Sequence, residues 1–274
     1  HYIWFVKLPL DEKGLVISAT RNHFLQIITD ALGAQLEHNK AAQGRLPENP
    51  YTFVPNQQQL ADFNSISRNV LQLPPSEYYS PAVLYFAQPQ AHDWQNVALQ
   101  GIADIAASVR RKEGALLITE NITKVAPQVQ QALMSSLENY ALDKDTSQCL
   151  IDHAHQRFNE PQQIQWTLRA LSQSVANTVV STFIQRVLDS QHGKTPEIML
   201  LIAARHWRCL QNEQILRQYI IQLADIDIEL CADLYSDLVQ IPSIRPTMLS
   251  VIRWQDKTPA VTRMVGHLFS GQQK

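Results

Sequence analysis

The residues best suited to chemistry in this chain lie in the heptapeptide CLIDHAH, residues 149–155. Cys149 and His153 are four positions apart, with Asp152 and His155 nearby, and thiolate, imidazole and carboxylate groups are the ligands that zinc takes from proteins. One turn of helix could present Cys149 and His153 to the same ion. A closed zinc site needs further ligands, which the sequence does not identify. Cys149 and His153 are therefore weak metal-ligand or catalytic candidates, and the alternative is a buried thiol beside exposed imidazoles.

The remaining catalytic motifs are absent or weaker. His206 and Cys209 are three positions apart in RHWRCL and permit the same two interpretations. The eight glycines include no G-x-G spacing, so the chain has neither a dinucleotide fingerprint nor a Walker loop. It also has no G-x-S-x-G, C-x-x-C or H-E-x-x-H. We expect no cofactor and no enzymatic activity, with an enzyme or metal protein using Cys149 and His153 as the alternative.

Arginine stands beside tryptophan at two places, an arrangement that can stack nucleic-acid bases. Arg205 and Arg208 flank Trp207, and Arg253 precedes Trp254. The formal net charge of the chain is −2, which does not favour a polyanion as the partner. Nucleic-acid binding is therefore an unlikely alternative function.

Helices of about a dozen residues are predicted to follow one another from residue 91 to residue 274. In the second half the predicted starts lie about 16 residues apart, so pairs of helices recur about every 33 residues. This spacing predicts a mainly α fold with a HEAT-like α-α superhelix, and an irregular helical bundle is the alternative. The predicted helix starts are near Asp93, Pro127, Thr146, Pro161, Ala176, Pro196, Asn212, Asp227, Ser243 and Pro259.

The basic run Arg110-Arg111-Lys112 is predicted to end the helix that starts near Asp93, just before Gly114. Positive charge is favourable at a helix C-terminus because of the helix dipole. A solvated helix end is therefore the simpler interpretation of this run, and a phosphate contact is the other.

One helix of each pair in a helical repeat lines the concave face, which usually binds the partner. If the second helices of the pairs do so, this face carries the aromatic and arginine side chains favoured at interfaces. The candidates for partner contacts are Arg186, Arg217, Tyr219, Arg253 and Trp254. The alternative for Tyr219 and Trp254 is a place in the hydrophobic core.

Residues 1–90 are predicted to form a small α+β portion. Ile3–Leu8 has the residue types of a strand and is apolar on both faces, so it should be buried and paired. The short partner candidates are residues 51–54, 82–86 and 115–119, and none makes a clean hairpin with it.

Two helices are predicted within residues 1–90. The first runs over residues 19–32, with Ser18 as its N-cap and Gly33 as its terminator. The second runs over residues 57–71, and its apolar residues form a stripe on one face. The stripe comprises Leu60, Phe63, Ile66 and Val70. Four prolines between residues 72 and 92 place a domain boundary there.

The opening stretch WFVKLPLD, residues 4–11, followed by HFLQIITDALG resembles an uncharacterised family of gammaproteobacterial proteins, a domain-of-unknown-function family. The likeness runs along the whole chain. Members of that family carry additional sequence upstream of this point. The resemblance implies that Ile3–Leu8 is the last strand of a small sheet whose other strands precede His1. It implies no activity, cofactor or catalytic residue.

The composition of the 274 residues is that of a folded protein, with 45% hydrophobic and 18% charged residues. The three cysteines are sparse and widely spaced, which indicates a reducing compartment such as the cytoplasm, and the family resemblance implies that this is a bacterial one. No apolar run is long enough to span a membrane, and no signal peptide is recognisable. We therefore predict a non-enzymatic module that binds a protein or peptide of unknown identity. An exposed strand edge near the N-terminus could also pair two copies of the chain.

Overall fold

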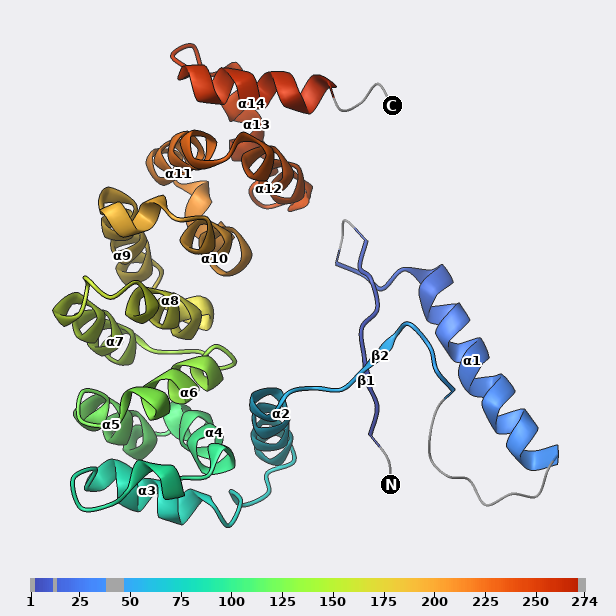
Figure 1. Ribbon diagram of the computed structural model, residues 1–274, viewed down its shortest axis with the longest axis vertical. Helices are drawn as coiled ribbons and strands as arrows, with labels where there is room; N and C mark the ends of the chain where they lie inside the picture. The colour runs from blue at the N-terminus through green and yellow to red at the C-terminus, as the bar shows by residue number, and fades with distance from the viewer. Residues whose placement is uncertain (1–2, 12–13, 38–46, 271–274) are drawn as a thin grey trace. The chain divides into compact units, whose positions relative to one another are not determined.

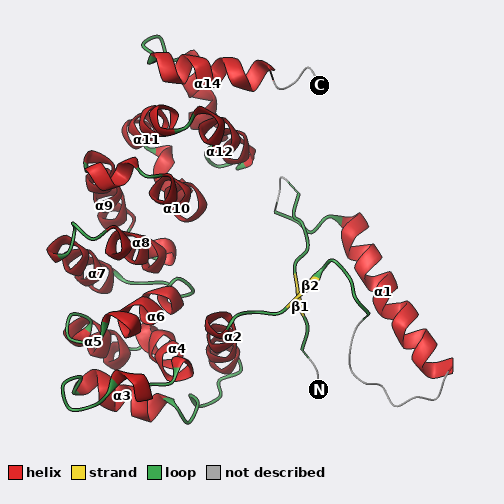
Figure 2. Ribbon diagram, viewed as in Figure 1, coloured by secondary structure: helices red, strands yellow, loops and turns green. Residues whose placement is uncertain are grey.

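A computed structural model describes residues 3–11, 14–37 and 47–270 of the chain. Most of these residues are helical. Fourteen α-helices and one two-stranded sheet are formed by the described residues (Figure 1; Figure 2). The chain divides into two compact units, residues 1–56 and residues 57–274. The fold is therefore mainly α, with a small sheet in the first unit.

The sheet of the first unit joins two segments that are distant in sequence. β1 (Phe5–Val6) pairs antiparallel with β2 (Thr52–Phe53), and Phe5 lies opposite Phe53. The Lys7 amide donates a hydrogen bond to the Tyr51 carbonyl at 2.8 Å, which extends the ladder. The partner of β1 in this structure is thus the downstream segment 51–54, one of the three predicted candidates, whereas the sheet implied by the family resemblance lay upstream of His1.

The helix of the first unit, α1, is longer than the sequence pattern indicates. It spans Ser18–Glu37 and continues through Gly33, so the prediction that Gly33 terminates the helix is wrong. Among the described glycines only Gly14 has a positive φ. Gly33 therefore does not adopt the left-handed conformation by which glycine ends helices. Tyr51 connects α1 to the sheet, because its hydroxyl lies 2.7 Å from His23 Nδ1 and its ring packs edge-on against Phe24.

The second unit contains thirteen α-helices among its described residues, joined by short loops and 3₁₀ turns. They are α2 (Gln57–Val70), α3 (Tyr79–Ala87), α4 (Leu99–Ala107), α5 (Lys112–Asn121), α6 (Pro127–Leu137), α7 (Lys144–Gln156), α8 (Pro161–Ala170), α9 (Asn177–Asp189), α10 (Pro196–His206), α11 (Glu213–Ile226), α12 (Ile228–Gln240), α13 (Arg245–Arg253) and α14 (Pro259–Ser270). None of the helices in the described part of the chain combines the length and apolar character needed to cross a membrane.

The predicted helix starts after residue 120 are confirmed to within two residues, because their signals are local. Four helices, α6, α8, α10 and α14, begin with proline, whose fixed φ and missing N–H suit the first helical turn. Asn212 caps α11 by accepting hydrogen bonds from the amides of Gln214 and Ile215. Asp227 caps α12 by accepting from the Leu230 amide. Each of these side chains satisfies amides that the helix itself leaves unpaired.

Between residues 78 and 121 the structure corrects the sequence analysis. Segments 82–86 and 115–119, which the sequence offered as strand candidates, lie in α3 and α5. The predicted helix near Asp93 is a 3₁₀ turn followed by α4, and α4 ends at Ala107. The run Arg110-Arg111-Lys112 therefore joins two helices instead of ending one, because Lys112 opens α5. Gly114 permits this tight junction, since a Cβ atom there would overlap Ser108.

The helices of the second unit form two rows. α4, α6, α8, α10, α12 and α14 pack successively on one another, and α5, α7, α9, α11 and α13 form the second row. Within this unit, α4, α6, α8, α10 and α12 lie on the inner side of its curve, and α5, α7, α9 and α11 lie on the outer side (Figure 1). Buried side chains fill the space between the rows as one continuous cluster, from Ala82 to Met264.

Helix α2 packs on α4 and α6 through an unexpected face. Its buried residues are Ala61, Asp62 and Ser65, whereas Leu60 and Val70 of the apolar stripe are 44% and 74% exposed. The apolar stripe of α2 therefore remains largely exposed. The buried polar side chains find partners on α4 and α6, which offsets their desolvation. Since α2 and α3 both pack on α4, the predicted boundary after residue 90 falls inside the second unit.

Candidate partner-binding surface

A groove crosses the inner row where α6, α8 and α10 lie side by side, and we call it the α6–α8–α10 groove. Its volume is about 430 Å³. Helix α8 buries Ile164 and Leu168 in the core, so Trp166, between them in sequence, projects from a different side. The groove is lined by Gln131 and Ser135 from α6, Gln165, Trp166 and Arg169 from α8, and Glu197, Leu200 and Leu201 from α10.

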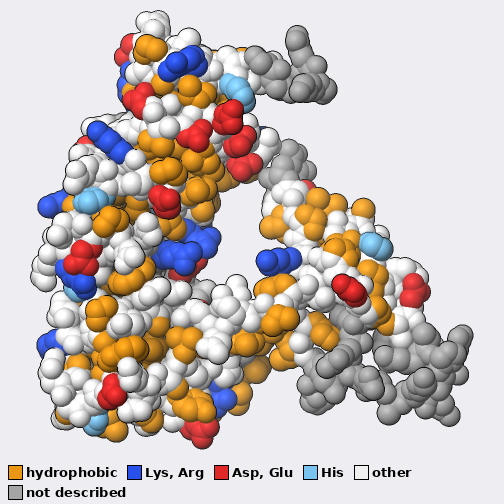
Figure 3. Space-filling view, in the orientation of Figure 1, with side chains coloured by type: hydrophobic (Ala, Val, Ile, Leu, Met, Phe, Trp, Pro, Cys, Tyr) orange, Lys and Arg blue, Asp and Glu red, His pale blue; other side chains and the backbone are white. Residues whose placement is uncertain are grey.

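The lining of this groove is chemically mixed. Trp166 and Leu201 are half-buried and Leu200 is 43% exposed, so an apolar surface is available to solvent. Arg169 and Glu197 are exposed and carry opposite charges. Hydrophobic, basic and acidic side chains all reach the surface along the inner side of the second unit (Figure 3). Tryptophan and arginine are the residue types that contribute most at protein interfaces.

An ion pair connects α6 and α10, the two helices that flank α8 in the groove. Arg205 of α10 contacts Glu138, the residue after α6, at 2.6 Å. The Glu138 carbonyl also accepts a hydrogen bond from the Ser172 hydroxyl at 3.0 Å. Because Arg205 is 41% exposed, the ion pair contributes little free energy. Its consequence is geometric, since it connects helices that are separated by α8 in the row.

Helix α2 already occupies the inner side of the neighbouring helices α4 and α6. Asp62 of α2 accepts hydrogen bonds from the Ser136 hydroxyl at 2.5 Å and from Gln58 at 3.0 Å. Ser65 donates to Asp104 of α4 at 2.6 Å. Burial raises the pKa of the Asp62 carboxyl, and the hydrogen bonds from Ser136 and Gln58 partly oppose this shift. Small and polar side chains therefore hold α2 against the helices of the inner row.

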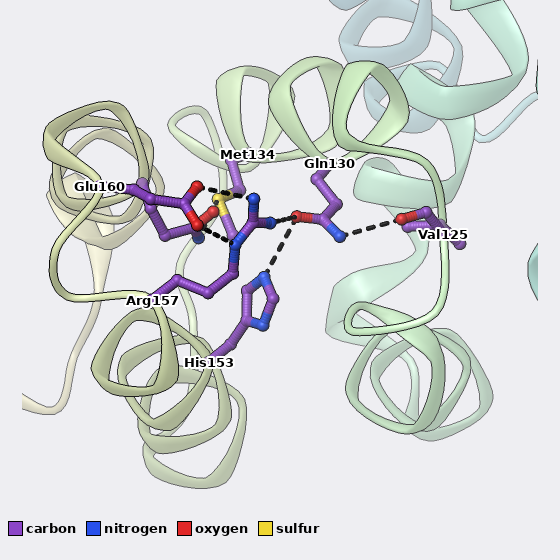
Figure 4. A network of polar contacts seen from close by, with 7 residues as sticks. Val125, Gln130, Met134, His153, Arg157 and Glu160 are labelled. Carbon is purple, nitrogen blue, oxygen red and sulfur yellow. Dashed lines mark hydrogen bonds and ion pairs between the residues drawn. The ribbon is translucent and has the colours of Figure 1, made fainter.

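The first chemical candidate, His153, is part of a buried hydrogen-bond network between α6 and α7 (Figure 4). Its Nε2 atom lies 3.1 Å from Gln130 Oε1, which also accepts from Arg157 at 3.3 Å. Because that oxygen can only accept, Nε2 donates this hydrogen bond. Gln130 in turn donates to the Val125 carbonyl, and Arg157 forms a two-point ion pair with Glu160. The interpretation of His153 as an exposed imidazole is wrong.

Cys149 and His153 point to different neighbours. The Cys149 thiol lies 3.4 Å from the Thr119 carbonyl on α5, whereas His153 contacts α6. Burial raises the pKa of the Cys149 thiol and lowers the pKa of His153. The first shift keeps the Cys149 thiol protonated, which makes it a poor nucleophile and a poor metal ligand, whereas the second shift keeps His153 neutral. Within the described ranges, no three or more His, Cys, Asp or Glu side chains gather as a metal site would require.

His206 and Cys209 are likewise held by structural contacts. His206 is buried at the end of α10, and its Nε2 donates to the Leu168 carbonyl of α8 at 2.7 Å. Burial lowers the pKa of His206 to about 4. The Cys209 sulfur accepts a hydrogen bond from Ser181 at 3.5 Å, and burial raises the pKa of its thiol. The two side chains therefore stabilise different helix contacts.

The five predicted partner contacts belong to the outer row and to the loop after it. Tyr219 is fully buried and donates to the Met199 carbonyl at 3.0 Å, so it is a core residue. Arg217 binds Asp256 at 2.5 Å and stacks over Trp254 at 5.0 Å from the ring centroid. The structure thus brings Arg217 and Trp254 together, but as partners of each other.

Arg186 and Arg253 are the two predicted contacts that remain exposed. Arg186 of α9 lies over the Phe158 ring at 5.5 Å, and Arg253 ends α13. The arginine–tryptophan neighbours proposed for base stacking are also engaged, since Arg208 stacks over Trp207 at 5.2 Å. The rings of Phe158 and Trp207 thus each have an arginine of this chain over one face.

Sequence reasoning missed the residues of the α6–α8–α10 groove, although two signals point to them. Ile198–Ala204 is an uninterrupted apolar run, and a helix that is apolar all round needs cover on more than one side. Trp166 lies off the apolar stripe of its own helix. Neither signal reveals which neighbouring helices complete the groove.

Comparison with known proteins assigns the chain to a family. No curated protein and no solved structure matches the chain. The family model described as "Protein of unknown function (DUF3549)" matches residues 1–269, which is nearly the whole sequence. The chain therefore belongs to the DUF3549 family.

Proposed function

We propose that the second unit is a HEAT-like α-α superhelix that binds a helical segment of a partner protein. The binding site is the α6–α8–α10 groove. The observation that carries this proposal is the combination of a half-buried Trp166 and an exposed Leu200 in one groove with a row of helices that already accommodates α2. The repeated packing of α6 on α8, α8 on α10 and α10 on α12 supports the repeat architecture.

The occupant is an amphipathic helix of another protein. An apolar stripe on such a helix would cover Trp166, Leu200 and Leu201. Arg169 and Glu197 carry opposite charges at the same groove, so a ligand with one acidic and one basic residue beside its apolar stripe fits best. α2 supports a helical occupant because it lies on the same row of helices through short side chains.

The proposed role is non-enzymatic. Its support is the state of the strongest chemical candidates: Cys149 and His153 contact different helices, and burial keeps the Cys149 thiol protonated. We propose the bacterial cytoplasm as the compartment. The three cysteines are unpaired in the structure, which is the usual state of thiols in a reducing environment.

A second copy of the chain is a further proposed partner, through the N-terminal strand. Ile3 and Trp4, which precede β1, are 65% and 43% exposed, and β1 pairs with one neighbour in a two-stranded sheet. Sedimentation velocity on the protein and on an Ile3→Lys variant tests this proposal. A dimer that is lost in the variant supports it, and a monomer at all concentrations refutes it.

The groove is tested with two matched substitutions. Leu200 of α10 and Leu249 of α13 are each 43% exposed, but only Leu200 lines the groove. Helical peptides are selected from a displayed library on the wild-type protein. Their dissociation constants are then measured for wild type, Leu200→Asp and Leu249→Asp.

We expect Leu200→Asp to weaken binding by about 2 kcal/mol or more, because a charge would replace an apolar contact at a central position. Leu249→Asp should bind as the wild type does. A photoreactive amino acid at position 200, with position 249 as the control, then identifies the natural partner in cells. Equal binding by both variants, or the absence of any selected peptide, would refute the proposal.

A further inference from the structure

We infer that a second site, independent of the proposed groove, binds a phosphate group. The site is a pocket between α2, α4 and the 3₁₀ turn at residues 108–110, and we call it the arginine pocket. Its volume is about 160 Å³, enough for a small anion with ordered water. Three arginines line it, Arg68 from α2 and Arg110 and Arg111 from the junction before α5, together with Asn69 and Asp104.

Two of the three guanidinium groups have no protein partner among the described residues. No hydrogen bond, ion pair or ring contact involves the side chain of Arg110 or Arg111, and both residues are exposed. Arg68 donates from Nε to the Pro74 carbonyl at 2.8 Å and from one terminal nitrogen to the Pro75 carbonyl at 3.4 Å. These bonds hold the Arg68 side chain in place and leave its other terminal nitrogen available.

The only carboxylate in the lining does not neutralise these arginines. Asp104 is buried, and one of its oxygens accepts from Ser65 at 2.6 Å and from Gln100 at 3.2 Å. The other oxygen accepts from the amide and the hydroxyl of Ser76 at 2.9 and 2.5 Å. Both oxygens are therefore engaged by neutral donors. Three arginines and one aspartate leave the pocket with a formal charge of +2, in a chain whose net charge is −2.

The basic run also breaks a rule of local structure. Arg111 is the N-cap residue of α5 and Lys112 its first residue, so positive charges stand at the positive end of the helix dipole. Arg111 makes no side-chain capping bond, and Glu113 is the only acidic residue in the first turn. Violations of local preference without compensation within the fold are typical of functional sites. A bound dianion would compensate this one.

The number and type of donors select the ligand class. Guanidinium groups form two-point hydrogen bonds with phosphate oxygens, and three of them match a tetrahedral group with several acceptors better than a two-oxygen carboxylate. The formal charge of +2 matches a phosphate dianion. The ligand is therefore inorganic phosphate or a small phosphomonoester, and the experiment distinguishes the two sources.

Isothermal titration calorimetry on the full chain tests this inference. Sodium phosphate and glycerol 3-phosphate are each titrated at pH 7.5 in a chloride buffer of constant ionic strength. The variants are Arg110→Gln, Arg111→Gln and the double substitution. Arg263→Gln is the matched control, because Arg263 is an exposed arginine of α14 outside the pocket. Circular dichroism checks that all variants keep the wild-type helix content.

We expect saturable binding of at least one of the two ligands to the wild type. Each single substitution should raise the dissociation constant by about tenfold, since a charge-assisted hydrogen bond is lost. Arg263→Gln should leave it unchanged. Tighter binding of phosphate identifies the free ion as the ligand, and tighter binding of glycerol 3-phosphate identifies a phosphomonoester. The inference is overturned if neither ligand binds the wild type, or if Arg263→Gln weakens binding as much as Arg110→Gln does.

Discussion

Acidification should destabilise the second unit through His206, and the structure provides the size of the effect. The imidazole is buried where α10 meets α8, and its Nε2 donates to the Leu168 carbonyl. Only the neutral ring suits this place, because burial and the nearby Arg205 both disfavour a second proton. The pKa of His206 is lowered from 6.5 to about 4. The substitution His206→Gln removes the titration but keeps an N–H donor.

The sign and magnitude follow from proton linkage. At pH 7 the ring is neutral in both the folded and unfolded states, so no free energy is lost. Between pH 6.5 and 4 the unfolded state binds a proton that the folded state does not, and the free energy of unfolding falls as the pH falls. For these pKa values the loss is about 2 kcal/mol at pH 5 and approaches about 3 kcal/mol below pH 4. Burial lowers the pKa of His153 and His155 as well, so their contributions have the same sign.

Two assays test this prediction. In urea unfolding at pH 7 and pH 5, the wild type should lose about 2 kcal/mol more than His206→Gln does. In an NMR titration of the imidazole C–H groups, the resonance that disappears in His206→Gln should not shift between pH 7 and pH 5. The NMR result is decisive, because arrays of helix pairs can unfold in parts. A His206 resonance with a midpoint near 6.5, or an equal pH dependence in the variant, would refute the reasoning.

Three other predictions concern packing and reactivity. Asp104→Ala should lower the free energy of unfolding by about 3 kcal/mol, because several buried donors lose their acceptor, and hydrogen exchange should accelerate first in α2. Gly101→Ala should lower the free energy of unfolding by about 2 kcal/mol, because its Cβ would overlap the Tyr78 carbonyl. Gly33→Ala, in open space, should instead stabilise α1 by about 0.5–1 kcal/mol. Thermal unfolding measures both effects, and equal effects would contradict the difference in space around the two glycines. Cys231 should react with iodoacetamide far more slowly in the native protein than in urea, because burial raises the pKa of its thiol to about 12. Mass spectrometry of the alkylated peptides measures the two reaction rates. Equal rates would be inconsistent with the burial of Cys231.

The helix array could be predicted from sequence because its signals span only a few residues. A proline at the first helical position, or an asparagine or aspartate just before it, satisfies or removes amides within one turn. Asn212 and Asp227 do so through bonds to residues two or three positions away. Such signals require no knowledge of the rest of the chain, so the helix starts after residue 120 could be predicted from the sequence.

The candidate site could not be predicted in the same way. Tyr219 and Trp254 have the residue types of interface contacts, but whether each is buried depends on which helices pack around it. Trp166 and Leu200 come from helices about one repeat apart, and they meet at one surface only because α8 and α10 are neighbours in the inner row. The arginine pocket likewise combines Arg68 with Arg110 and Arg111 across the contact between α2 and α4.

The sequence by itself determined the mainly helical class of the protein, the starts of most of its helices and its membership of the DUF3549 family. Only the tertiary structure decided the pairing of β1 with β2, the polar buried face of α2 and the residues that line the two candidate sites. Helix starts depend on backbone groups satisfied within one turn. Strand partners and buried faces depend on contacts between residues far apart in the chain, where a polar side chain such as Asp62 is buried because its partner, Ser136, lies on another helix.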